Sequence, residues 1–97
     1  MIIVMATLVV KPEKKGALVP LTLELILKTR DEEGCISYEL LDSPEDECRK
    51  IFLERWESME TLDAHMKTEH FINFGKNTDG FFSEAMDIKV YEANEMK

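Results

Sequence analysis

The sequence predicts an α+β domain with elements in the order β-α-β-β-α-β, and three features of its hydrophobic pattern lead to this prediction. Residues 2–10 are apolar at almost every position, which is typical of a central strand buried on both faces. Residues 35–41 and 51–57 alternate in polarity with the period of half-buried strands. Helical spacing of apolar residues separates these strands. The order is that of a ferredoxin-like domain, with a four-stranded antiparallel sheet, the first and third strands central, and two helices on one face.

The first helix is expected over residues 13–33 and is interrupted by a proline. Pro20 either kinks this helix or lies in the first turn of a helix that begins near Val19. Gly34 is expected to end it. The side chains expected to face the sheet are Leu18, Leu21, Leu25 and Ile26.

The second helical region follows the third strand directly. Ser58 is expected to cap a helix with Glu60 in its first turn. Its predicted buried stripe is Met59, Leu62 and Met66, with His65 at the edge. Thr68 is expected to cap a further short helix that carries Phe71, Ile72 and Phe74. The last strand is expected over residues 85–92, and the acidic residues 42–50 are expected to form a mobile turn.

Length and charge limit the class of protein. A chain of 97 residues suits one domain over residues 1–97. The net charge of −8, without clustered Lys and Arg, disfavours nucleic acid and anionic membranes as partners. No apolar run approaches the ~20 residues that cross a bilayer. Residues 2–10 lack the features of a secretory signal, so a cytoplasmic protein is expected.

The two cysteines are expected to be free thiols. Cys35 and Cys48 lie on either side of a hairpin bend predicted near Pro44. Pairing about that bend would separate them by roughly 20 Å at ~3.3 Å per residue. A disulfide requires Cα atoms within about 7 Å, so the spacing argues against one.

A homodimer is expected from the distribution of apolar residues. Both helices of a ferredoxin-like domain cover the same face of the sheet, yet apolar side chains of the strands also point to the other face. Exposed faces of this kind usually mark an interface or a ligand cavity. We therefore expect two copies to pack sheet to sheet, with pockets between sheet and helices.

One stretch of the sequence resembles a known family. The motif EXWXS, then AH on a helix, then TXHF, is formed by Glu54, Trp56, Ser58, Ala64, His65, Thr68, His70 and Phe71. It resembles the corresponding segment of the antibiotic-biosynthesis monooxygenase (ABM) family. Residues 32–40, EEGCISYEL, and the KPE at residues 11–13 are similar to the same family, so the likeness extends over nearly the whole chain.

The resemblance implies a dimeric α/β barrel and several possible activities. Members include quinol and polyketide monooxygenases without a prosthetic group, heme-degrading enzymes, and an isomerase that acts on a phosphorylated signal. In heme-degrading members an asparagine, a tryptophan and an iron-ligating histidine stand where this chain aligns Thr7, His65 and Gly75. Heme degradation is therefore not expected. The sequence also lacks a glycine-rich phosphate loop or a dinucleotide fingerprint, so no cofactor is expected.

His65 is the candidate catalytic residue, as a base that accepts the proton of a substrate hydroxyl. The alternative is a hydrogen-bonded structural histidine. The candidate substrate-binding residues are Phe52, Glu54, Trp56, Tyr38, Phe71 and Phe74. The alternative for the rings is a place in the core, and for Glu54 it is a bond across the dimer.

No metal site is expected. His70 follows His65 at i+5, roughly 140° around an ideal helix, so the two would not share a face. His65 and Glu69 have i, i+4 spacing, but no third ligand is apparent in the sequence.

Three functions remain open from the sequence. The first is a cofactor-independent monooxygenase for a small aromatic such as a quinol or polyphenol. The second is an isomerase or detoxifying enzyme for a small carbonyl metabolite that uses the same histidine. The third is a non-catalytic dimeric binding domain. The sequence does not name the substrate.

Overall fold

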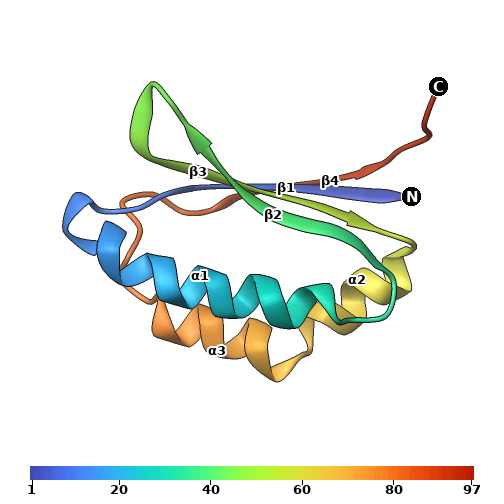
Figure 1. Cartoon of the computed structure of the whole chain (residues 1–97), viewed down its shortest axis with the longest axis horizontal. Coiled ribbons are helices and arrows are strands. Elements are labelled where there is room, and N and C mark those ends of the chain that lie inside the picture. Colours follow the sequence, from blue (N-terminus) through green and yellow to red (C-terminus); the bar gives the residue numbers. More distant parts are fainter.

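A computed structural model describes residues 1–97 as one antiparallel sheet with its α-helices on one side (Figure 1). The strands are β1 (Ile2–Val9), β2 (Cys35–Ser43), β3 (Asp46–Trp56) and β4 (Asp87–Glu92). The helices are η1 (Pro12–Lys14), α1 (Lys15–Arg30), α2 (Met59–Met66) and α3 (Glu69–Asn77). The strand order β2-β3-β1-β4 places β1 and β3 at the centre, so the predicted ferredoxin-like α+β fold is confirmed.

The core lies between the sheet and the helices. The residues of β1 that face the helices are Ile2, Val4, Ala6 and Leu8, and all four are buried. The alternate residues Ile3, Met5, Thr7 and Val9 point to the other face, which no element of the chain covers (Figure 1). The apolar strand was therefore correctly placed in the middle of the sheet, but within one chain only one of its faces is buried.

A β-bulge changes which residues of β2 reach the core. Cys35 pairs with Trp56 and Ser37 pairs with Arg55, so Ile36 is the extra residue between them. Regular alternation over residues 35–41 would place Ile36 and Tyr38 on the same face, but Tyr38 is buried, whereas Ile36 is exposed. The bulge thus brings Tyr38 alone from this pair onto the helix side of the sheet.

The connection between β2 and β3 is shorter than predicted. Both strands continue through much of residues 42–50 and leave only Pro44 and Glu45 in the turn. The bend is where it was expected, but a turn that extends over residues 42–50 was the wrong prediction. Cys35 and Cys48 are free thiols, as expected.

Helix α1 begins at Lys15 and has Pro20 in its interior, so the alternative of a helix that begins near Val19 is wrong. It ends at Arg30, earlier than predicted, and a turn follows in which Gly34 has φ +83°. A Cβ atom on Gly34 would lie 2.2 Å from Cγ2 of Thr61 in α2. Glycine at position 34 therefore provides both the left-handed backbone and room for the close approach of α2.

Both predicted caps are present. The hydroxyl of Ser58 accepts a 3.3 Å hydrogen bond from the backbone N–H of Thr61, and Thr61 accepts one in return from the N–H of Ser58. Thr68 caps α3, so α2 ends before α3 begins. Because of the break at residues 67–68, α2 and α3 run in different directions along the sheet (Figure 1).

The buried side of α2 differs from the prediction. Leu62 and His65 are its buried residues, whereas Met59 and Met66 are 44% and 43% exposed. The side of the helix that faces the sheet therefore carries Leu62 and His65, spaced i and i+3, and His65 belongs to the buried side rather than to its edge. No helix in the structure has the length and apolar character needed to span a membrane.

Candidate active site

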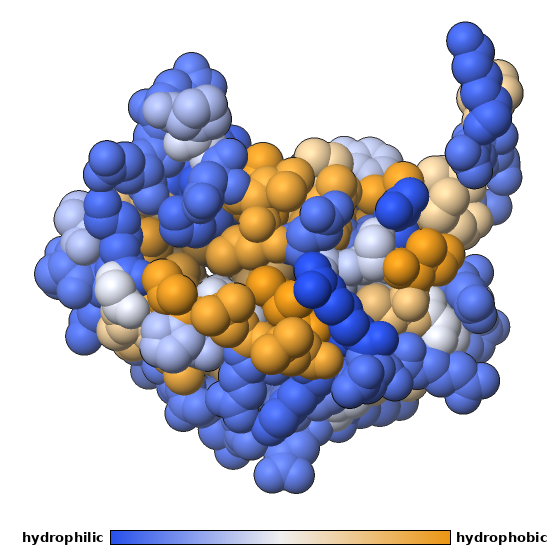
Figure 2. Space-filling model, in the orientation of Figure 1, coloured by the Kyte–Doolittle hydropathy of each residue, from blue (hydrophilic) through white to orange (hydrophobic).

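A cavity of about 370 Å³ lies between the helix side of the sheet and helices α2 and α3. Apolar side chains gather around a hollow between the sheet and the helices in the orientation of Figure 1 (Figure 2). Twelve of the 18 residues that line it are hydrophobic. Apolar cavities of this size with a few polar groups are typical of small-molecule sites.

The structure brings six of the seven candidate site residues to this cavity. They are Tyr38, Phe52, Glu54, His65, Phe71 and Phe74. Trp56 does not line it, because its ring is fully buried behind the wall. The indole Nε1–H of Trp56 donates a 3.0 Å hydrogen bond to Oε1 of Glu54, so the tryptophan holds the carboxyl group from behind.

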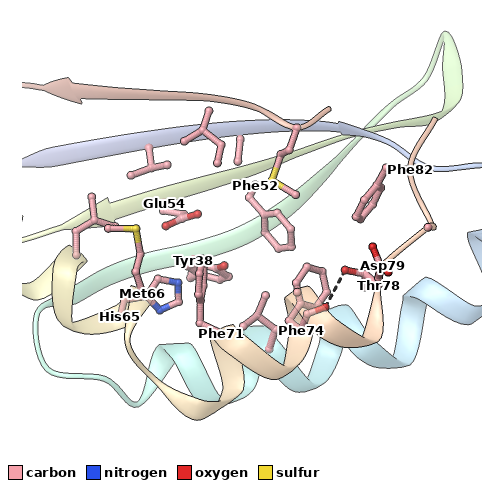
Figure 3. Close-up of a pocket in the computed structure, with 18 residues that line it drawn as sticks. Tyr38, Phe52, Glu54, His65, Met66, Phe71, Phe74, Thr78, Asp79 and Phe82 are labelled. Carbon is pink, nitrogen blue, oxygen red and sulfur yellow. Dashed lines mark hydrogen bonds between the residues drawn. The ribbon is translucent and has the colours of Figure 1, made fainter. Parts of the chain in front are cut away.

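The polar groups lie at two ends of the cavity. Glu54 and His65 are at one end, Thr78 and Asp79 are at the other, and the rings of Phe52 and Phe74 lie between them (Figure 3). The two phenylalanine rings meet edge to face at 5.9 Å. The arrangement suits an elongated molecule with an apolar middle and a polar group at each end.

One ring nitrogen of His65 is hydrogen-bonded within the protein and the other has no hydrogen-bond partner. Its Nδ1 lies 2.7 Å from Oε2 of Glu32, in the turn after α1. An ionised carboxylate only accepts hydrogen bonds, so this contact places the imidazole hydrogen on Nδ1. Nε2 is buried and has no hydrogen-bond partner in the protein. His65 therefore presents a lone pair as a proton acceptor.

The rings around His65 keep it in place and dry. The Trp56 ring lies 4.8 Å away, Phe71 5.0 Å and Tyr38 5.4 Å between centroids. Burial lowers the pKa of His65, while the hydrogen bond and the charge of Glu32 raise it in part and the charge of His70 lowers it. The net effect lowers the pKa, so the imidazole of His65 is uncharged near pH 7 and can accept a proton.

His70 shares the same carboxylate oxygen. Its Nε2 lies 2.7 Å from Oε2 of Glu32, and the two imidazole centroids are 6.1 Å apart. The two histidines were predicted not to share a face of one helix, but they lie on two helices, α2 and α3, and both reach Glu32. Glu32 was missed as a site residue, since it lies 33 residues from His65 and forms no local motif with it.

Glu32, His65 and His70 are also the residues that could hold a metal ion. Their ligand atoms lie within 4.8 Å of one another, and two imidazoles with one carboxylate suit zinc or iron. The 2.7 Å separations are those of hydrogen bonds. Metal-bound histidines usually donate their second N–H to an acceptor, and Nε2 of His65 has none. The geometry thus favours a hydrogen-bonded triad over a metal centre.

Glu54 is the second titratable group at the same end of the cavity. Burial raises its pKa to about 7, against the hydrogen bond from Trp56, which lowers it; the charge of Glu32 raises it further. Much of Glu54 is therefore protonated at neutral pH and able to donate a hydrogen bond. Burial also raises the pKa of Tyr38, which stays a neutral phenol.

The fold and this cavity define a class of protein: a ferredoxin-like α+β domain with an aromatic-walled site between its sheet and helices. The family profile of the antibiotic biosynthesis monooxygenases (ABM) matches residues 1–77. The chain therefore belongs to the ABM family.

Individual relatives and a solved structure are similar to the chain over most of its length. The chain is 31% identical to the Synechocystis protein sll1783 over 94 residues, 97% of its own length, but it spans only 64% of that relative. It is also 30% identical to YcnE of Bacillus subtilis, which is provisionally named a monooxygenase. That alignment of 95 residues covers 98% of this chain and 100% of YcnE. A crystal structure of an antibiotic biosynthesis monooxygenase superposes with a TM-score of 0.92 at 30% identity, covering 98% and 100% of the two chains.

Proposed function

We propose that this protein is a cofactor-independent monooxygenase for a small electron-rich aromatic, such as a quinol or polyphenol, with His65 as its base. The observation that carries the proposal is the unpartnered, buried Nε2 of His65 beside an apolar cavity of about 370 Å³. A buried acceptor without a donor is costly in the free protein. A substrate hydroxyl would satisfy it.

The chemistry needs little beyond a base and a dry, shaped cavity. His65 takes the proton of a ring hydroxyl, which leaves an electron-rich anion that reacts with dioxygen. A quinol and dioxygen then give a hydroxyquinone and water. The quinol supplies all four electrons, one oxygen atom enters the ring and the other leaves as water, so no external reductant is required.

The walls of the cavity support an aromatic substrate. Phe52 and Phe74 present apolar ring surface at its middle, and Glu54 is placed to donate a hydrogen bond to a carbonyl or phenolic oxygen near His65 (Figure 3). Thr78 and Asp79 offer polar contacts at the far end. A ring system with oxygens at both ends would match this distribution.

Oxygen uptake by the purified protein against a panel of reduced quinones and polyphenols tests the proposal. His65→Asn is the critical variant, because its amide can still donate to Glu32 but has no group in place of Nε2. General base catalysis of this kind is worth about 100- to 10,000-fold, and we expect a loss in that range. Glu45→Gln, in the exposed turn between β2 and β3, is the matched control and should match the wild type. Equal uptake by His65→Asn and the wild type would refute the proposed base.

A second candidate, an isomerase acting on a small carbonyl compound, is favoured by the presence of both His65 and Glu54 at one end of the cavity. A neutral base and a protonated carboxyl group in one cavity are what enolisation needs: one removes a proton beside the carbonyl and the other donates to its oxygen. Turnover that persists without dioxygen, and is lost in Glu54→Met, whose side chain has no hydrogen-bond donor, would favour this activity over oxygenation.

We further propose that the single domain of residues 1–97 works as a homodimer joined through the open face of its sheet, closing a dimeric α/β barrel. Met5 and Tyr91 on that face are 38% and 49% exposed, and Leu53 lies opposite Met5. Light scattering should give twice the chain mass of 11.2 kDa. Leu53→Glu should give the monomer, because a charge would be buried at the centre of the interface. A wild-type monomer at micromolar concentration would refute this arrangement.

A further inference from the structure

A single carboxylate oxygen joins three segments of the chain behind the cavity. Oε2 of Glu32 is 2.7 Å from Nδ1 of His65 in α2 and 2.7 Å from Nε2 of His70 in α3. The side chains become more exposed from the cavity outward: 1% for His65, 13% for Glu32 and 17% for His70. The cavity base is thus linked, through one acceptor, to a histidine in contact with solvent.

We propose that Glu32 and His70 are positioning residues for His65: Glu32 fixes the tautomer with Nε2 free, and His70 limits how strongly the shared carboxylate favours the protonated imidazole. The inference deepens the proposed function and rests on it, since the tautomer matters to catalysis only if His65 is the base.

The tautomer follows from the hydrogen-bonding capacity of the three groups. An ionised carboxylate has no hydrogen to donate, so both nitrogens that contact Glu32 carry one. For His65 this places the hydrogen on Nδ1 and leaves Nε2 as an acceptor. Without Glu32, nothing at Nδ1 would hold the hydrogen there, and Nε2–H would become available. A protonated Nε2 accepts no proton from a substrate.

His70 acts on His65 through charge. Glu32 raises the pKa of His65 by its hydrogen bond and its charge, whereas a charged His70 lowers it, and burial lowers it most. The other titratable groups that face His65 are Tyr38 from β2, kept neutral by burial, and Glu54 from β3, at the same end of the cavity. Protonation of His70 therefore opposes protonation of His65, and the base stays neutral further into the acid range.

The outer face of His70 supports its exchange with solvent. It lines a small polar pocket between α1 and α3, together with Lys28, Asn73 and Asn77. This pocket is separate from the apolar cavity that His65 lines. Its polar groups and the partial exposure of His70 bring the outer imidazole into contact with solvent, whereas His65 is buried.

Nitrogen-15 NMR of the histidine rings in the free protein tests the inference without a substrate. We expect the wild type to show the Nδ1–H tautomer of His65. Glu32→Gln retains a carbonyl acceptor, so the tautomer should persist while the pKa of His65 falls by about one unit. Glu32→Leu should lose the tautomer preference. His70→Gln keeps an N–H donor but carries no charge, so the pKa of His65 should rise.

Opposite shifts in Glu32→Gln and His70→Gln are the signature that a merely structural role would not produce. Shifts in the same direction, no shift in His70→Gln, or an Nε2–H tautomer in the wild type would overturn the inference. Stoichiometric zinc in the purified protein, with His65 signals that change on addition of EDTA, would also overturn it in favour of a metal site.

The two proposals fail in distinguishable ways. If the ring signals behave as expected but no quinol, polyphenol or carbonyl compound is turned over, the proposed function fails and the positioning of His65 is supported. If turnover depends on His65, but the acid limb of the kcat/KM profile stays in place in both Glu32→Gln and His70→Gln, the proposed function holds and the positioning role is refuted.

Discussion

Ionisation of Glu54 should make the protein less stable as the pH rises, and a single substitution should remove the effect. The carboxyl group is buried on β3, where Oε1 accepts the indole hydrogen bond of Trp56. Glu54→Gln removes the titratable group, nearly preserves its shape and keeps a carbonyl oxygen for Trp56. The substitution therefore isolates the cost of placing a negative charge in the cavity wall.

The magnitude follows from the pKa of Glu54. Burial raises it from 4.5 to about 7, so the folded protein holds this proton more tightly than the unfolded chain does. The contribution of protonated Glu54 to the free energy of unfolding is then at its full value below pH 4.5, and it declines as the pH rises to about 7. At about 1.4 kcal/mol per unit, the full loss is about 3 kcal/mol. Glu54→Gln should show none of it.

Urea denaturation followed by circular dichroism measures the difference between the two proteins. Measurements from pH 5.5 to 8.5 avoid the isoelectric point, near 4.7. Over that interval the advantage of Glu54→Gln over the wild type should grow by about 2 kcal/mol, because part of the loss has already occurred at pH 5.5. Glu45→Gln, at the exposed β2–β3 turn, should run parallel to the wild type. A constant difference between Glu54→Gln and wild type would refute the reasoning.

Three further substitutions or profiles test other features. Gly34→Ala should destabilise the protein by about 1–3 kcal/mol, because Gly34 has φ +83° and an added Cβ atom would collide with Thr61. A Cβ atom at Gly16 meets nothing within 4 Å, so Gly16→Ala is the control and should not destabilise the protein; thermal unfolding compares the two variants. Thr68→Ala should cost about 1 kcal/mol through loss of the α3 cap, measured by urea denaturation. Once a substrate is identified, the acid limb of the kcat/KM profile should lie below pH 6.5, since the pKa of His65 is lowered; an acid limb that begins above pH 6.5 would contradict the neutral base.

Much of the fold could be predicted because its signals are local. Strand alternation placed Phe52, Glu54 and Trp56 on one side of β3, and all three are buried there. Ser58 and Thr68 marked the helix starts, since a cap requires only a side chain and the backbone a few residues on. Periodicity failed to predict which side chains are buried at two places. They are the β-bulge in β2, which adds one residue to the strand, and α2, whose two methionines are exposed.

The sequence by itself determined the order of the elements and the alternation of the third strand, and it indicated His65 as the candidate base. Only the tertiary structure decided how His65 is held: it brought Glu32 to His65 and His70 across 33 and 38 residues, and placed Trp56 behind the wall. Hydrogen bonding along a segment is set by nearby residues, whereas the meeting of side chains from three segments depends on how these pack together. Here it depends on a two-residue break between helices and a glycine turn without a Cβ atom.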